Sequence, residues 1–433
     1  MRRIDDLILY RPRQQDAILT AMTDLIQGME SGTLSDDEAR PVFFRCIGSL
    51  VEEAASCGFY GNLWHTYLTH LLVDHENAFS KASEIRGAIE GSLNEMAYHD
   101  FRIFKELFDY DLAGMGRRLG SSQSEVLSDF RSGNDSYILY NRRIRDRICD
   151  LASQLEKAPD TAAFKRAMEE FYREYGVGRL GLNKAFRIEH DEAGKPVIVP
   201  ITNIAHVNLD DLVGYEIPKK KLIDNTEAFV AGRKANNCLL FGDAGTGKSS
   251  SIKAIANKYY DRGLRVIEVY KHQIKDISAI ITEIKNRHYR FILFMDDLSF
   301  EDFEVEYKYL KAIIEGGLEK KPENVLIYAT SNRRHLIREN YEDKQGRRMQ
   351  DMHASDTVEE KLSLAARFGV TIYFASPDKK EFNTIVTELA KRAGIAMTDD
   401  ELLLEANKWV MHHGGYSGRT AQQFIDYLLG QEA

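Results

Sequence analysis

The sequence is poor in cysteine and has no long apolar run. Its 433 residues include four cysteines, Cys46, Cys57, Cys149 and Cys238, and none of them forms a C-x-x-C pair. This spacing lacks the usual zinc and dithiol-redox motifs and is typical of free thiols in a reducing compartment. No apolar stretch approaches the roughly 20 residues that a membrane-spanning helix requires, and the N-terminus has no signal-peptide pattern. We therefore expect a soluble, cytoplasmic protein with no membrane partner.

Positive charge is not in excess. The chain has 58 basic and 67 acidic residues, a formal net charge of −9. One basic run, NRRIRDRICD, is interrupted by Asp146, so a solvated helix face is the preferred interpretation over a nucleic-acid surface. His65, His70 and His75 recur at intervals of five and do not share a helix face, so they do not predict a metal site together.

The hydrophobic pattern changes along the chain. Up to about residue 180 it is helical, as in the run FKRAMEEFYREY, whose apolar residues recur at helical spacing. Residues 186–201 read as two short strands around an Asp-Glu-Ala-Gly turn. From Leu239 to Phe374, five apolar strand patterns alternate with helical ones, and the last 55 or so residues return to helix. This order predicts an α/β domain with a five-stranded parallel sheet covered on both faces.

GDAGTGKS fits the phosphate-loop pattern G-x-x-x-x-G-K-[ST] between an expected strand and an expected helix. The glycines allow backbone N–H groups to face a phosphate chain, and the helix N-terminus adds its dipole. Lys248 would reach the β- and γ-phosphates and Ser249 would coordinate Mg²⁺; the alternative is a plain glycine-rich turn. The motif predicts ATP and Mg²⁺ as cofactors, bound by Gly242, Asp243, Ala244, Gly245, Thr246, Gly247, Lys248, Ser249 and Ser250.

Two adjacent acids end the strand FILFM. A carboxylate at the C-terminal end of a neighbouring strand is suited to the metal shell, which we assign to Asp296. Asp297 would orient or deprotonate the attacking water. The alternative is that both acids end a strand in solvent.

With these motifs the chain from about Leu209 to its end resembles the AAA+ ATPases. The resemblance implies that Val213, Gly214 and Tyr215 in DDLVGYEIPKKKL contact the base. It implies that Asn332, after YATS, senses the γ-phosphate and water. In EEKLSLAARFG it points to Arg367 as an arginine finger, with Arg333 and Arg334 as competitors. In GGYSGRTAQQF it points to Arg419 as a second sensor. Three of these residues also have ordinary interpretations: Arg367 as a surface residue, Asn332 as a turn residue and Arg419 as an ion-pairing residue.

The resemblance also implies an organisation. It gives a P-loop AAA+ core over residues 209–375 and a helical lid over 376–433. A mainly α-helical N-terminal domain over 1–180 would bind a partner, and 181–208 would be a short β linker. Runs such as ANNCLLFGDAGTGKSS and SGRTAQQFIDYL are similar to a family of uncharacterised bacterial AAA+ proteins known as a domain of unknown function. The polar insert 337–357 is either functional or disordered.

Several functions remain open at this point. The first is an AAA+ ATPase that acts in a homo-oligomer, because the finger of this family works across a subunit boundary, and remodels or regulates a protein partner. The others are a replication-loader-like nucleic-acid factor, a non-hydrolysing nucleotide switch and, most remotely, a small-molecule kinase. No basic helix-turn-helix follows the lid, and VYKHQIKD lacks the loop with which threading machines grip a polypeptide. Asp297 replaces the Glu that most AAA+ proteins carry and withdraws the carboxylate by ~1.5 Å. We therefore expect slow, assembly-dependent hydrolysis.

Overall fold

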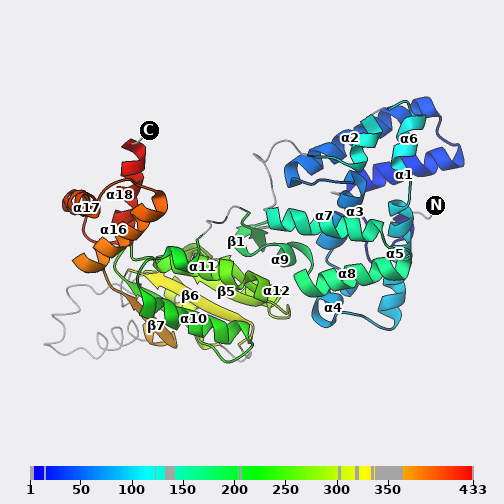
Figure 1. The fold of residues 1–433 in the computed structure, drawn as a ribbon. Helices are drawn as coiled ribbons and strands as arrows, with labels where there is room; N and C mark the ends of the chain where they lie inside the picture. The colour runs from blue at the N-terminus through cyan, green and yellow to red at the C-terminus, as the bar shows by residue number, and fades with distance from the viewer. Residues whose placement is uncertain are drawn as a thin grey trace. The chain divides into compact units, whose positions relative to one another are not determined.

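The computed structural model divides the chain into two compact units, Met1–Asn183 and Lys184–Ala433 (Figure 1). Among the described residues, no helix has both the length and the apolar character needed to cross a membrane. The structure describes residues 4–13, 16–121, 123–131, 142–202, 204, 207–300, 304–316, 321–332, 336 and 364–431.

The N-terminal unit is helical, as expected. Several of its helices begin at polar caps: Ser35 and Glu38 form a capping box at α2, and the Asp160 side chain caps α8. Its buried core is rich in large side chains, among them Trp64, Phe101 and Phe164. The helices are α1 (Ala17–Ser31), α2 (Asp36–Cys57), α3 (Leu63–Asp74), α4 (Ala78–Arg86), α5 (Ser92–Phe108), α6 (Leu112–Arg118), α7 (Arg142–Glu156), α8 (Thr161–Tyr175) and α9 (Gly178–Leu182), with 3-10 turns η1 (Ile4–Asp6) and η2 (Gln123–Ser128).

In the part of the second unit that the structure describes, one sheet has seven strands, two more than the five-stranded sheet that the sequence predicted. Its spatial order is β2-β1-β4-β5-β6-β3-β7. The five expected strands are all present and parallel. The hairpin expected in the linker instead extends the sheet, because β1 pairs parallel to β4 and β2 pairs antiparallel to β1. The strands are β1 (Ala185–His190), β2 (Pro196–Pro200), β3 (Cys238–Gly242), β4 (Leu264–Glu268), β5 (Arg290–Met295), β6 (Val325–Ser331) and β7 (Val370–Phe374).

Helices cover both faces of this sheet. On β6, Leu326 and Tyr328 pack in one core cluster with residues of α10 and α11, whereas Val325 and Ile327 line a groove with residues of α12 and α13. This alternation places successive side chains on opposite faces, as the strand period requires. The helical segments are η3 (Leu209–Asp211), α10 (Glu216–Val230), α11 (Lys248–Tyr259), η4 (Tyr260–Arg262), η5 (Lys271–Asp276), α12 (Ile277–Ile284) and α13 (Glu306–Glu315).

The three expected C-terminal helices form a separate apolar cluster within the second unit. Phe382, Leu402 and Phe424, one from each helix, are buried together. Capping boxes start the first two helices, at Asp378 and Thr398. The helices are α16 (Lys379–Ala393), α17 (Asp399–His413) and α18 (Gly418–Gln431).

Gly242, the last residue of β3, is required by the packing of the sheet. Its φ is +137°, and an added Cβ would lie 2.0 Å from the carbonyl oxygen of Phe374 on β7. The first glycine of the phosphate-loop pattern therefore serves the contact between two strands.

We predict that Gly242→Ala destabilises the protein. The strained backbone should cost about 1–3 kcal/mol, and the steric overlap a similar amount. The measurement is the thermal unfolding midpoint, with Gly430→Ala in α18 as the control, since nothing lies within 4 Å of the Cβ added there. Equal midpoints for the two variants would contradict this account of the β3–β7 contact.

Candidate functional site

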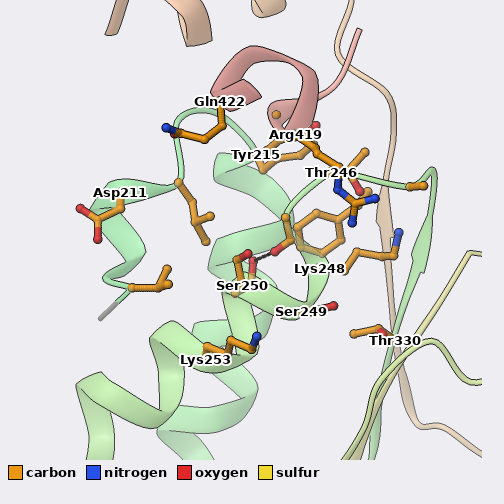
Figure 2. A pocket seen from close by; sticks show the side chains of 18 of the residues that line it. Asp211, Tyr215, Thr246, Lys248, Ser249, Ser250, Lys253, Thr330, Arg419 and Gln422 are labelled. Atoms are coloured by element: carbon orange, nitrogen blue, oxygen red, sulfur yellow. Dashed lines mark hydrogen bonds between the residues drawn. The ribbon is translucent and has the colours of Figure 1, made fainter. Parts of the chain in front are cut away.

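A cavity of about 740 Å³ lies where β3, β5 and β6 end, beside the N-terminus of α11 and the C-terminal helices. All the residues that the sequence predicted for the site line it, except Gly214, Gly242, Asp243 and Arg367. Figure 2 shows Tyr215, Lys248, Thr330 and Arg419 around this space.

Lys248 is buried at the start of α11, and its ammonium group is held by acceptors. It donates to the carbonyl oxygens of Gly242 at 2.8 Å and Asp243 at 2.6 Å, and to Oδ1 of Asn332 at 3.0 Å. Burial lowers the pKa of Lys248, and the negative charge of Asp243 opposes this change. The lysine thus connects the phosphate loop to the end of β6.

One carboxylate oxygen of Asp296 accepts hydrogen bonds from two hydroxyl groups. Ser249 and Thr330 each donate to its Oδ1 at 2.5 Å. Ser249 comes from α11 and Thr330 from β6, so the carboxylate after β5 joins three elements at one point. Hydroxyl and carboxylate oxygens together are a donor set that hard divalent cations favour.

Thr330 also fixes the neighbouring acid. Its hydroxyl accepts a hydrogen bond from the backbone N–H of Asp297 at 2.9 Å, and Asn332 Nδ2 donates to Oδ1 of Asp297 at 2.7 Å. One hydroxyl therefore holds both aspartates, donating to one and accepting from the other. Thr330 lies in the segment YATS before Asn332, but its role was not predicted, because a contact between strands leaves no local sequence signal.

Asp297 has a left-handed backbone conformation, with φ of +49°. Asp and Asn tolerate this region better than most residues that carry a Cβ. The conformation gives a physical reason for the shorter acid at this position.

The apolar end of the cavity contains Val213 and Tyr215, which precede α10. The ring of Tyr215 lies 5.5 Å from that of Phe374, centroid to centroid. Burial raises the pKa of Tyr215 to about 12, so its hydroxyl stays protonated at neutral pH. Ile385 and Leu389 of α16 complete an apolar lining suited to a flat ring. Gly214 is not part of this lining.

The last helix contacts the phosphate loop directly. The backbone N–H of Arg419 donates to the carbonyl oxygen of Gly245 at 3.1 Å. Gly245 has φ of +76°, and a Cβ there would lie 2.9 Å from Oγ of Ser417. Arg419 and Gln422 line the cavity. Gln422 was not among the site residues predicted from the sequence.

Two predicted site residues have other partners. The Asp243 carboxylate accepts hydrogen bonds from the backbone N–H (3.1 Å) and the hydroxyl (2.9 Å) of Ser376, so it joins the phosphate loop to the segment after β7. Arg367 Nε donates to Glu315 at 2.6 Å and does not line this cavity. The competing finger residues Arg333 and Arg334, and the insert 337–357, lie outside the described residues.

We predict that Thr330→Val lowers the free energy of unfolding by about 1–3 kcal/mol, because it leaves the partly buried N–H of Asp297 without its acceptor and removes the hydrogen bond to Asp296. Thr330→Ser keeps the hydroxyl and loses one methyl group, so it should cost about 0.8 kcal/mol. Urea denaturation measures both. A valine variant at least as stable as the serine variant would contradict the bridging role.

Comparisons with known proteins found similarities over parts of the chain. Replication factor C subunit 3 of Schizosaccharomyces pombe is 28% identical over 108 residues, which are 24% of this chain and 30% of that protein. The chain thus spans under a third of that relative. Among solved structures, the Thermotoga maritima RuvB Holliday junction branch migration motor aligns over 52% of this chain and 72% of its own, at 17% identity and a TM-score of 0.33. The FIGL-1 AAA domain in complex with ADP aligns over 52% and 76%, at 17% identity and a TM-score of 0.34.

A family model covers more of the chain than the curated relative does. It matches residues 182–432, which include the whole sheet, the phosphate loop and the C-terminal helices. The chain belongs to the family described as protein of unknown function (DUF815).

Proposed function

We propose that the protein binds ATP with Mg²⁺ in this cavity and hydrolyses it slowly in an assembly of identical subunits. The observation that carries the proposal is the convergence of Lys248, Ser249, Asp296, Asp297 and Asn332 on one end of the sheet. These are the groups that phosphoryl transfer needs for positioning and for charge stabilisation.

The oxygen donors around Asp296 fit a Mg²⁺ ion. Ser249 and Asp296 would hold it, directly or through water, as a hard cation prefers oxygen ligands. A bound Mg²⁺ neutralises charge on the β- and γ-phosphates. Thr330 keeps the Asp296 carboxylate oriented toward Ser249 through its own hydrogen bond.

The remaining groups would act on the phosphates and on water. The Lys248 ammonium would exchange its loop carbonyls for phosphate oxygens, since it already lies at the loop. Asp297 would accept a hydrogen bond from the attacking water, oriented by Asn332. The short Asp side chain supports slow turnover, because small displacements of a catalytic group reduce rates strongly.

Arg367 pairs with Glu315 and does not line its own subunit's cavity, so any contact that it makes with a nucleotide would be with one in another subunit. A guanidinium is suited to charge stabilisation on phosphate oxygens. In an assembly, Arg367 would enter the site of a neighbouring subunit, and the N-terminal unit would contact a protein partner. A second candidate, a nucleic-acid-associated ATPase, is favoured by the short similarity to a replication factor subunit. Binding to DNA that weakens steeply with salt would support that candidate.

Hydrolysis should depend on protein concentration and on Asp297. We expect the rate per subunit to rise as the wild-type protein is concentrated, and Asp297→Asn to lower it at least tenfold while ATP still binds. Asp224→Asn, an exposed acid on α10, is the matched control. Phosphate release measures turnover and fluorescent-nucleotide titration measures binding. Nucleotide binding without turnover at any protein concentration would contradict the proposed hydrolysis and leave a non-hydrolysing nucleotide switch as the remaining function.

A mixing experiment tests the contribution of a second subunit. Lys248→Ala removes the ammonium group inside the cavity. Arg367→Ala removes the proposed arginine finger, which lies outside the cavity of its own subunit. We expect each variant alone to be nearly inactive and a mixture of the two to recover part of the activity, because some interfaces then contain an intact site and an intact finger. A mixture no more active than its components would argue against Arg367 acting across an interface.

A further inference from the structure

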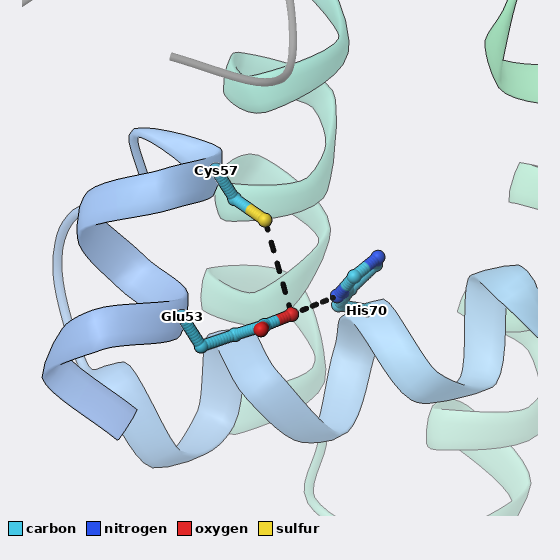
Figure 3. Close-up of side chains that lie close together, drawn as sticks. All are labelled: Glu53, Cys57 and His70. Carbon is cyan, nitrogen blue, oxygen red and sulfur yellow. Dashed lines mark hydrogen bonds and ion pairs between the residues drawn. The ribbon is translucent and has the colours of Figure 1, made fainter. Parts of the chain in front are cut away.

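Three side chains of the N-terminal unit converge away from the nucleotide cavity. Glu53 and Cys57 lie four residues apart on α2, and His70 comes from α3 (Figure 3). Their ligand atoms, a carboxylate oxygen, the thiol sulfur and a ring nitrogen, all lie within 4.8 Å of one another. His70 therefore meets a carboxylate and a thiol instead of the two other histidines of its segment.

The distances resemble those between ligands of one tetrahedral ion. Zinc binds nitrogen, oxygen and sulfur at about 2.0–2.3 Å, so the edges of its tetrahedron measure roughly 3.3–3.8 Å. Nδ1 of His70 lies 3.3 Å from Oε1 of Glu53, and Sγ of Cys57 lies 3.8 Å from the same oxygen. Two of the three edges already have this length, and the third, between the sulfur and the imidazole nitrogen, is at most 4.8 Å.

The surroundings also suit a cation. Glu53 and Cys57 are one helical turn apart and share a face of α2. The ring of Phe59 lies edge-on to His70 at 5.3 Å and limits its movement. Cys57 is buried, whereas the Glu53 side chain is 35% exposed and leaves a way in from solvent. A thiolate and a carboxylate together would balance the two positive charges of a divalent ion.

We propose that Glu53, Cys57 and His70 form a site for a zinc-like divalent cation that joins α2 to α3. Imidazole and thiolate are the ligand types that select such an ion over Mg²⁺ or Ca²⁺, and zinc also accepts a carboxylate oxygen beside them. Three protein ligands leave a fourth position for water or an external group. Binding transfers the Cys57 thiol proton to solvent, and because burial raises the pKa of this thiol to about 12, the metal must displace that proton.

Cobalt(II) added to the full-length protein tests the ligand set directly. Co²⁺ occupies zinc sites and gives a thiolate-to-metal absorption band only where cysteine is a ligand. This band separates the site from metal bound at the phosphate loop or at other histidines. We expect a band that saturates at one Co²⁺ per chain and disappears on adding Zn²⁺. No thiolate band at saturating Co²⁺ would overturn the proposal.

Variants then assign the band to these residues. Cys57→Ser and His70→Gln should each abolish it or weaken binding at least a hundredfold, whereas Cys46→Ser, a buried cysteine on the same helix, should leave it unchanged. Zn²⁺ should raise the thermal midpoint of the wild type and of Cys46→Ser but not of Cys57→Ser. Circular dichroism checks that each variant is folded. A band that survives in folded Cys57→Ser would place the metal elsewhere and refute the assignment.

Discussion

The hydrogen bonds at Asp296 hold the candidate site together. One carboxylate oxygen accepts from Ser249 on α11 and from Thr330 on β6, while Asp296 itself follows β5. A helix and two strands therefore meet at one atom, and the same Thr330 hydroxyl holds the backbone of Asp297. Because hydrogen bonds to an ionised group are stronger than neutral ones, this junction limits the movement of Ser249, Thr330 and the two aspartates.

The structure brings predicted site residues together where the sequence signal is contiguous. The phosphate loop and the two aspartates lie in short segments with a recognisable pattern, and the structure places most of their residues in one cavity. The helical N-terminal unit and the alternating α/β pattern followed from hydrophobic periodicity. The two extra strands were predicted as strands, but their pairing was not, since partner choice depends on contacts distant in the sequence.

The parts that the sequence did not predict are contacts between segments. Thr330 has its role because β6 lies beside β5, and nothing in the order of residues shows this. Gly242 and Asp243 were assigned to phosphate binding by position in the motif, and the structure adds contacts that the motif does not predict, of Gly242 with Phe374 and of the Asp243 carboxylate with Ser376. The left-handed conformation of Asp297 is also a property of the folded chain, and it gives a structural reason for an Asp where a Glu was expected.

The central claim of the proposed function is that Asp296 marks the position of a cation beside bound nucleotide. Isothermal titration calorimetry of ATP, with Mg²⁺ and with a chelator, measures this directly for the wild type and for Asp296→Asn. We predict that Mg²⁺ strengthens ATP binding to the wild type about tenfold or more, a gain of about 1.4 kcal/mol, and that most of this gain is lost in the variant. An equal Mg²⁺-dependent gain in both proteins would contradict the account.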